Sequence, residues 1–564
     1  MSSKNRVNSN KIDYIDILFL IAPFMSGLLP VWSLALFSML CIGGIVYKII
    51  KNKRFRVPTG KNIVFILVYL FSFLVVEFYA VDKGMNLLAF FKNFSILLFV
   101  LLYVQLDHQK DFRDRFRVIP YSACCTVILS LLLMINPNNT IFYNGRLQGI
   151  FNYANSFGLF LLLGIFVLSN KDKFGWKDYI LFFVLFLGVI LTNSRAIILL
   201  TVFTIIITMF INKTNMKEKI ILAISFLLLF SGIYFFSTIE KRVSSDMMQS
   251  SELITRLLYY SDAIKMIKDN PFGYGYEGWY YKQCEMQTGV YDTKFVHNSI
   301  LQVILDVGII PAIALIIMLS LTFFSKKQNA FSRMMMLLIL GHSLIDIDLE
   351  YVCFIILLIP LIDFNEKEIK NQKGLILINV IMSILCVWYC FIFFSDVSYE
   401  SKNFEGAVKI IPFHTEALQE ILYSTTDSNK QLEYAYKVLK YNLNISGAYE
   451  AISHELVSKN EYIQAIEMEE KRLKLNKYTM YHYLTYAELL SDGINYYGKN
   501  QQMENQKFLL QKVVEIEKTI NDVLRNTNPL CYQTIHTPNM EMPDELQQFI
   551  EKAKTALSTV SKNS

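Results

Sequence analysis

Charged residues are scarce in this chain. They make up 18% of its 564 residues, whereas hydrophobic residues make up 53% and aromatic residues 14%. Such a continuous apolar content excludes an ordinary soluble enzyme and predicts an integral membrane protein. The net charge of +6 is concentrated in particular loops, so we read it as a signal of membrane topology and not as a nucleic-acid-binding surface.

The chain also lacks a cysteine motif. Six of the eight cysteines fall inside apolar runs, and only Cys284 and Cys531 do not. This arrangement gives neither a CxxC zinc pattern nor a disulfide framework. The N-terminus carries basic residues before its first apolar run, but no small-residue cleavage site closes that run. We therefore predict an uncleaved first span.

Long apolar runs are what the chain has in abundance. Many approach the length of about 20 residues that a helix needs to cross a bilayer. They cover residues 14–29, 31–50, 62–80, 87–106, 118–135, 153–169, 177–193, 195–211, 219–237, 299–324, 331–348, 351–363 and 374–395. The sequence therefore predicts an all-α fold, a polytopic bundle of about 12–13 transmembrane helices.

Connections rich in Lys and Arg alternate with connections that have few cations. The basic ones are residues 51–61, 107–117, 171–177, 212–219 and 326–333. By the positive-inside rule these lie in the cytoplasm together with the N-terminus. The other connections, including a large loop at residues 238–298, are then extracytoplasmic. An odd number of spans also places the polar tail outside.

The tail, residues 396–564, differs in composition from the rest. It is rich in Glu, Lys, Gln and Tyr, and its apolar positions recur every three or four residues, as in amphipathic helices. Residues 432–476 and 478–520 look like tandem helical hairpins of the tetratricopeptide type, with a plain helical bundle as the alternative. We expect two domains: a transmembrane domain (residues 1–395) and an extracytoplasmic helical domain (residues 396–564).

Three arginines lie at the outer ends of the predicted spans, against the charge bias. They are Arg146 in YNGRLQG, Arg195 in TNSRA and Arg256 in ELITRLLYY. An arginine near the hydrocarbon boundary is costly and commonly faces an anion. Its planar guanidinium suits phosphate or pyrophosphate, because it donates two parallel hydrogen bonds and stays charged. The alternatives are an arginine that snorkels to the interface or one paired with Asp262 or Glu252.

A histidine lies on the same outer side. His297 precedes an apolar run in HNSILQVILDVG. The partial positive charge of a helix N-terminus disfavours imidazolium, so we expect a neutral ring that can act as a general base. Asn298 and Ser299 suit the N-cap. The alternative is an interfacial histidine that bonds only a backbone carbonyl.

A second group of ionisable residues occurs in GHSLIDIDLEY, which contains His342, Asp346 and Asp348. The Asp-x-Asp spacing can bind a divalent cation. We expect instead that these side chains hydrogen-bond to the external loop or line the path of the acceptor, and we predict no metal site.

Taken in order, the motifs GRLQGIFNYANSFG, TNSRA, TRLLYYSDAIKMIKDNPFGYGYEGW and HNSILQVILDVGIIP resemble the O-antigen ligase and Wzy polymerase superfamily. This superfamily includes bacterial O-oligosaccharyltransferases, and the helical tail resembles its branch with tetratricopeptide extensions. The resemblance implies a GT-C-like glycosyltransferase in the cytoplasmic membrane of a bacterium. Such enzymes move a glycan from undecaprenyl pyrophosphate to a hydroxyl of a glycan, lipid or protein acceptor on the outer face, without a cofactor.

The resemblance also implies roles for individual residues. Arg195 and Arg256 would bind the donor pyrophosphate, and Arg146 would either help them or brace the external loop. His297 would deprotonate the acceptor. With one base and no carboxylate nucleophile, direct displacement would invert the anomeric carbon. Supporting positions are Asn298, Gln302, His342, Asp346 and Asp348.

Two other classes compete with this interpretation. A transporter or flippase for a lipid-linked glycan would need charges or broken helices inside the spans, and Asp306, Glu77 and Lys92 are the few candidates. A scaffold would recruit envelope proteins through the tail, but so many spans are excessive for an anchor. Ligase and polymerase use the same donor and differ in the acceptor, so both stay open.

Overall fold

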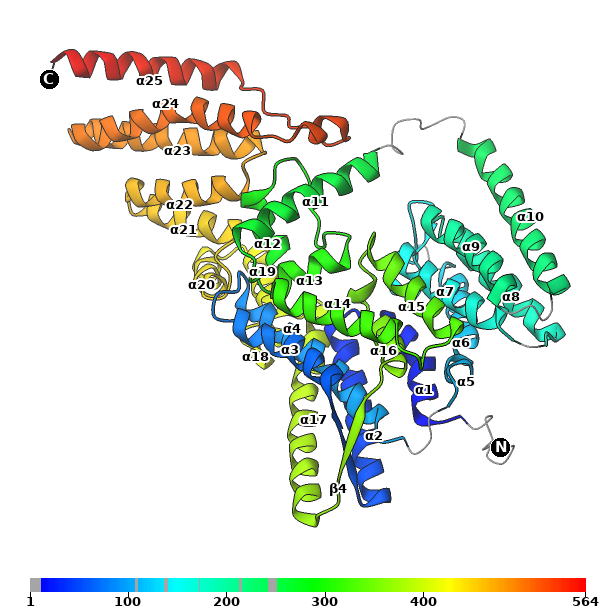
Figure 1. The fold of residues 1–564 in the computed structure, drawn as a ribbon. Helices are drawn as coiled ribbons and strands as arrows, with labels where there is room; N and C mark the ends of the chain where they lie inside the picture. Colours follow the sequence, from blue (N-terminus) through cyan, green and yellow to red (C-terminus); the bar gives the residue numbers. More distant parts are fainter. Residues whose placement is uncertain are drawn as a thin grey trace.

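The computed structural model describes residues 12–106, 110–135, 140–171, 173–211, 216–241 and 251–563. These residues are mostly helical, with four short strands among them (Figure 1), which confirms the all-α class. The helices up to the large loop are α1 (Tyr14–Ile21), α2 (Val31–Asn52), α3 (Lys61–Val76), α4 (Lys83–Tyr103), α5 (Phe112–Phe116), α6 (Ile119–Leu133), α7 (Ala154–Ser169), α8 (Trp176–Leu191), α9 (Arg195–Ile211) and α10 (Met216–Lys241).

The large loop itself contains two helices and leads into the helices that precede the C-terminal region. They are α11 (Ser251–Asp269), α12 (Gly278–Met286), α13 (Ser299–Val307), α14 (Ile309–Phe323), α15 (Ala330–Ser343), α16 (Val352–Leu358) and α17 (Gln372–Glu400). Strand β1 (Phe55–Thr59) pairs with β4 (Asn365–Ile369), and the two-residue strands β2 (Phe142–Tyr143) and β3 (Arg146–Leu147) form a small hairpin.

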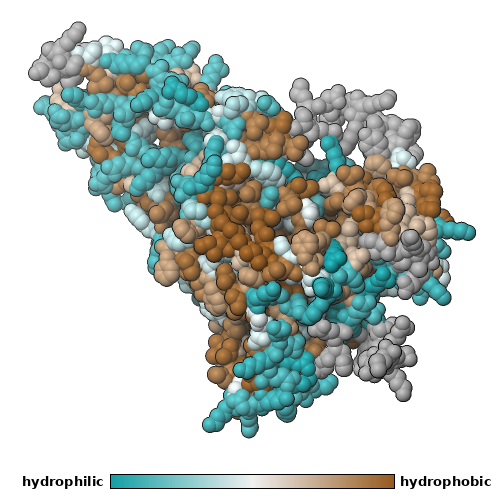
Figure 2. All heavy atoms as spheres, viewed as in Figure 1, coloured by the Kyte–Doolittle hydropathy of each residue, from teal (hydrophilic) through white to brown (hydrophobic). Residues whose placement is uncertain are grey.

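Several helices in the described residues have membrane character. Four are long and apolar enough to cross a bilayer, namely Val31–Asn52, Lys83–Tyr103, Phe112–Leu133 and Gln372–Glu400, and six shorter apolar segments accompany them. Figure 2 shows hydrophobic side chains gathered over the middle of the molecule, between hydrophilic C-terminal helices and a hydrophilic patch at the end where β4 lies. The arrangement fits an all-α membrane protein; the count of 12–13 spans stays a prediction.

The run at residues 299–324, predicted as one span, is two helices. They meet at Gly308, which has φ +90°. A Cβ there would lie 2.8 Å from the Phe272 backbone, because the NPFGYG turn runs directly against this break. The amide of Ile309 donates to the Pro271 carbonyl at 2.9 Å. The short helix α13 is thereby separated from α14, and it begins next to His297.

The C-terminal region is a stack of helices. They are α18 (Phe404–Ile410), α19 (Thr415–Ser424), α20 (Ser428–Leu439), α21 (Ser446–Ser458), α22 (Tyr462–Leu475), α23 (Met480–Lys499), α24 (Met503–Arg525) and α25 (Asp544–Asn563). Successive helices pack on one another, and Figure 1 shows α21 to α25 layered away from the membrane helices. Helix α17 continues past residue 395. The domain boundary, the tetratricopeptide character and the external placement stay predictions.

The C-terminal helices dock closely on the start of α4. Asp82, the N-cap of α4, accepts hydrogen bonds from Thr415 Oγ1 and Asn442 Nδ2, each at 2.9 Å. At Gly84 an added Cβ would overlap the carbonyl oxygen of Phe413. The two regions therefore approach each other so closely that no side chain fits between them at this position.

Candidate functional site

The connection between α15 and α16 carries three carboxylates at alternate positions. Asp346, Asp348 and Glu350 lie in IDIDLEY, around the short 3₁₀ turn η4 (Asp348–Glu350). Each carboxylate takes partners from different helices. The segment therefore connects groups that are far apart in the sequence.

Asp346 is the meeting point of several motifs. Its carboxylate is 1% exposed and accepts hydrogen bonds from Tyr153 Oη and Asn155 Nδ2, both at 2.6 Å. Arg256 Nη2 lies 3.5 Å from Oδ2, and His297 Nδ1 lies 3.4 Å from Oδ1. Burial opposes ionisation, but the hydrogen bond with His297 and the charge of Arg256 outweigh it and lower the pKa of Asp346 below its usual value.

The HNS motif is built around the same segment. Asn298 is the N-cap of α13, as predicted: its Oδ1 accepts from the amides of Ile300 and Leu301 at 3.0 Å. Its Nδ2 donates to the Leu344 carbonyl at 2.8 Å. Ser299 Oγ donates to the Asp346 carbonyl at 2.9 Å. The start of α13 is thus bonded to the connection that carries Asp346.

His297 is held in an uncommon conformation. Its φ is +54°, in the left-handed region that costs energy for a non-glycine residue. Tyr260 Oη donates to its carbonyl at 2.8 Å. The rings of Tyr153 and Tyr259 flank the imidazole, each with its centroid 6.3 Å away. The side chain is 22% exposed, so the ring is both oriented and accessible.

Gln302 fixes the residue before this histidine. Its Oε1 accepts from the Val296 amide at 3.1 Å, and its Nε2 donates to Asp306 Oδ1 at 2.9 Å. Gln302, predicted as a supporting residue, thus contacts the backbone just before His297 with its side-chain oxygen and Asp306 of α13 with its side-chain nitrogen.

Arg256 projects from α11 to the same place. Its Nη1 donates to the Ile345 carbonyl at 2.6 Å, beside the ion pair with Asp346. The considered pairing with Asp262 does not occur, because that carboxylate is bonded by Thr288 and Tyr291 inside the loop. The pairing with Glu252 concerns a side chain outside those described.

Arg146 and Arg195 differ in their surroundings. Arg146 donates from Nε to the Thr192 carbonyl at 3.1 Å and from Nη2 to Asn155 Oδ1, so it links the TNSR turn to the Asp346 cluster. Arg195 is the exposed first residue of α9. No hydrogen bond or ion pair joins it to the cluster in the part of the chain that the structure describes.

His342 and Asp348 form a separate buried pair. His342 Nδ1 lies 2.5 Å from Asp348 Oδ2, with the two side chains 1% and 0% exposed. Ser156 Oγ donates to the other oxygen of Asp348 at 2.8 Å. Among the described residues no group of three or more His, Cys, Asp or Glu is placed to hold a metal ion.

Lys92 and Asp306, two of the charged residues that the transporter interpretation would need, both have polar partners. Lys92 Nζ lies 3.0 Å from Glu350 Oε2 and donates to Tyr276 Oη at 3.2 Å. Asp306 accepts from Gln302. Sequence reasoning did not single out Tyr153, Asn155 and Ser156 individually, although polar residues at the start of an apolar helix were a visible signal.

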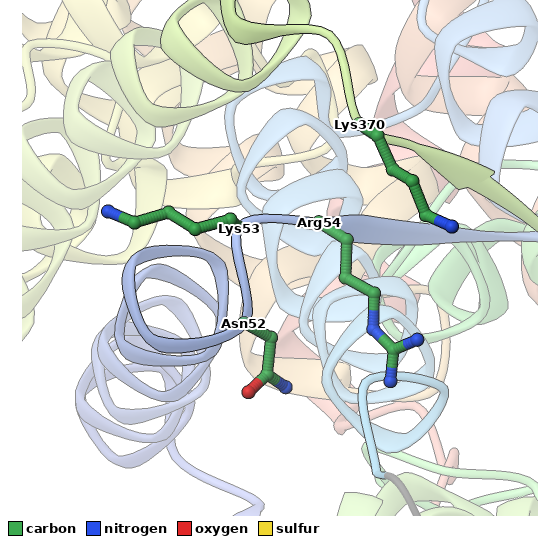
Figure 3. A pocket seen from close by; sticks show the side chains of 4 residues that line it. All are labelled: Asn52, Lys53, Arg54 and Lys370. Atoms are coloured by element: carbon green, nitrogen blue, oxygen red, sulfur yellow. The ribbon is translucent and has the colours of Figure 1, made fainter.

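A shallow, open surface pocket of about 410 Å³ lies elsewhere, at the end of α2. It is lined by Asn52, Lys53, Arg54 and Lys370 (Figure 3). None of the predicted site residues lines it. It belongs to the basic 51–61 connection and the β1–β4 pair, not to the cluster around Asp346.

Comparison with known proteins points to one family. Residues 180–317 match the family model described as O-antigen ligase. The matched segment includes Arg195, Arg256 and His297 and ends before Asp346. The match confirms the resemblance to the O-antigen ligase superfamily over the last three of the four ordered motifs. The GRLQG motif and the tetratricopeptide-like tail lie outside the matched residues. No curated protein and no solved structure matches the chain.

Proposed function

We propose that this protein is a metal-independent, inverting glycosyltransferase, because residues 180–317 match the family model described as O-antigen ligase. It moves an oligosaccharide or polysaccharide from an undecaprenyl-pyrophosphate donor to an acceptor hydroxyl on the outer face of the cytoplasmic membrane. The acceptor is a second copy of the glycan repeat in a polymerase, and a lipid or protein in a ligase.

One observation carries the proposal. His297 and Arg256 come from different motifs, yet both contact Asp346, at 3.4 and 3.5 Å. An imidazole beside a guanidinium combines a group that accepts a proton with a group that stabilises phosphate charge. The transfer needs both functions: a proton acceptor for the attacking hydroxyl and positive charge beside the leaving pyrophosphate.

In the proposed step His297 acts as the general base. Asp346 accepts a hydrogen bond from the Nδ1–H group of the ring, which leaves the Nε2 lone pair free for the acceptor hydroxyl. The acceptor oxygen attacks the anomeric carbon as its proton moves to Nε2. The bond from that carbon to the pyrophosphate oxygen breaks at the same time, so undecaprenyl pyrophosphate leaves and the anomeric configuration inverts.

The three arginines have different roles in the proposed step. Arg256 and Arg195 stabilise the pyrophosphate as negative charge develops on the leaving oxygen. Among the described contacts Arg146 donates to Thr192 and Asn155 and reaches neither Asp346 nor His297, which favours its role as a brace over direct donor binding. Asn298 and Gln302 hold the backbone on either side of His297.

Transfer by the purified protein tests the proposal. The full chain in detergent is incubated with a defined undecaprenyl-pyrophosphate oligosaccharide and, in separate reactions, with the same glycan, envelope lipid or envelope protein as acceptor. We expect one acceptor to gain sugar with inverted configuration by NMR, and the reaction to continue in a chelator. Transfer that persists in His297→Ala, or that the chelator stops, overturns the mechanism.

A further inference from the structure

Lys294 joins the segment that carries His297 to the C-terminal helices. Its Nζ lies 2.7 Å from Glu277 Oε1, at the start of α12, and 2.8 Å from Glu416 Oε1, on α19. Glu277 is 2% exposed. One ammonium group thus connects the large loop, the His297 segment and the C-terminal region.

Other contacts place the same loop against the C-terminal helices. Asn444 Nδ2 donates to the Tyr281 carbonyl at 3.2 Å, and Tyr281 Oη donates to Gln419 Oε1 at 3.0 Å. Farther along the chain, the Asn528 amide donates to the Thr288 carbonyl at 2.7 Å. The C-terminal region therefore holds α12 and the turn after it at several points.

The segment from residue 293 to residue 298 has no helix or strand of its own. Its backbone is fixed at Thr293, whose carbonyl accepts from Trp279 Nε1 at 3.1 Å and Gln283 Nε2 at 3.0 Å. It is fixed again at Val296 and His297, by Gln302 and Tyr260. Between these points Lys294 provides the ion pair that reaches outside the loop.

We propose that the C-terminal helical region positions the His297 segment through the Lys294–Glu416 ion pair, with Lys294 as a positioning residue of the transfer reaction. The inference rests on the proposed function. The C-terminal region is then a part of the catalytic unit and not only a platform for recruiting an acceptor.

The physical basis is the strained position of His297. A residue at φ +54° keeps that conformation only when its surroundings over-determine it. The carboxylate of Glu416 holds the Lys294 side chain three residues before the histidine. Without this contact the segment has more freedom, and a base that is displaced by about 1 Å can lose about a hundredfold in rate.

The test compares four variants of the full chain. Lys294→Met removes the link. Lys265→Met is the matched control, because Lys265 is similarly exposed and its ion pair with Asp262 stays inside the loop. Glu416→Lys breaks the pair from the other side, and the exchange Lys294→Glu with Glu416→Lys restores one lysine and two glutamates to the triad. Transfer kinetics and hydrogen exchange of residues 293–298 are measured on each.

We expect Lys294→Met and Glu416→Lys to lower kcat about tenfold with the donor KM unchanged. We also expect faster exchange in residues 293–298, and the exchange variant recovers both. Lys265→Met behaves as the unmodified chain. If Lys294→Met matches Lys265→Met in kcat and exchange, the inference is wrong while the proposed function stands. If the unmodified chain transfers no glycan, the proposed function fails, and hydrogen exchange alone decides whether the two regions are coupled.

Discussion

Two histidine–aspartate pairs lie beside one short segment and have opposite surroundings. His342 and Asp348 are fully buried and 2.5 Å apart. His297 and Asp346 are 3.4 Å apart, with the histidine 22% exposed. A guanidinium, that of Arg256, accompanies only the second pair among the described contacts. The same two residue types therefore form a structural link in one case and an accessible, charged site in the other.

The difference arises from the helices that supply the partners. His342 belongs to α15 and Ser156 to α7, and both meet Asp348 between packed helices. His297 belongs to the irregular segment before α13 and faces the large loop. A buried pair gains rigidity, because neither member contacts water. An accessible pair keeps a nitrogen that a substrate can reach.

Replacing each histidine by alanine gives the largest contrast. We expect His297→Ala to lower transfer by about 10²–10⁴-fold, the usual contribution of a general base, with little change in melting temperature. We expect His342→Ala to destabilise the protein by about 3–5 kcal/mol, because it removes the imidazole from a buried carboxylate that then keeps only Ser156 Oγ as a partner. Transfer assays and thermal unfolding in detergent measure both. A stable, active His297→Ala protein would remove the distinction between the pairs.

Replacing the two aspartates should give smaller effects than replacing the two histidines. Asp346→Asn keeps the shape of the side chain but no longer attracts the Nδ1 proton of His297, so we expect kcat to fall about ten- to a hundredfold. Asp348→Asn is expected to lower the melting temperature more than kcat. The loss of kcat should therefore be larger for Asp346→Asn, and the loss of melting temperature should be larger for Asp348→Asn. Equal losses in the two variants would contradict separate roles for the aspartates.

The sequence predicted the parts of this arrangement that depend on local patterns. The apolar runs identified the all-α membrane class, and the Asn-Ser pair identified Asn298 as an N-cap. The break at Gly308 was not predicted, because it depends on the distant Pro271 backbone and the apolar run continues through it. The convergence on Asp346 likewise depends on contacts between residues far apart in the chain, which no local period encodes.

The arginines show the same limit. Their positions near the outer ends of apolar runs were visible in the sequence, but their partners were not. Arg146 bonds Asn155 and Thr192, whereas Arg256 reaches Asp346. Similar positions in the sequence thus correspond to one arginine that links Thr192 to Asn155 and one that pairs with Asp346. The role of Arg195 in donor binding stays a prediction.

Arg256→Lys tests whether the site at His297 and Asp346 needs the planar guanidinium of arginine and not only its positive charge. Lysine keeps the positive charge near Asp346 but cannot donate two parallel hydrogen bonds. We expect kcat/KM for the donor to fall about tenfold, less than the loss of a complete oxyanion donor. Lys265→Arg, in the same helix, serves as the control and should leave donor kinetics unchanged. An unaltered kcat/KM in Arg256→Lys would show that charge alone suffices.

Glu277 extends the comparison to a buried carboxylate with too few donors. Asp346 has several donors and a lowered pKa, whereas burial raises the pKa of Glu277 to about 8, against the opposing charge of Lys294 and with the help of Glu416 and Asp82. Between its ordinary value of 4.5 and about 8, the folded protein holds a proton that the unfolded chain has lost. Stability that is full below pH 4.5 therefore declines as the pH rises through this window.

Glu277→Gln removes this titration, because its amide stays neutral. We expect the melting temperature of the unmodified chain to fall by a few degrees between pH 6 and pH 9, and that of Glu277→Gln to fall less. Glu420→Gln neutralises an exposed carboxylate on α19 and should keep the original slope. Parallel pH profiles for all three proteins would show that Glu277 is ionised throughout, and the contrast with Asp346 would then disappear.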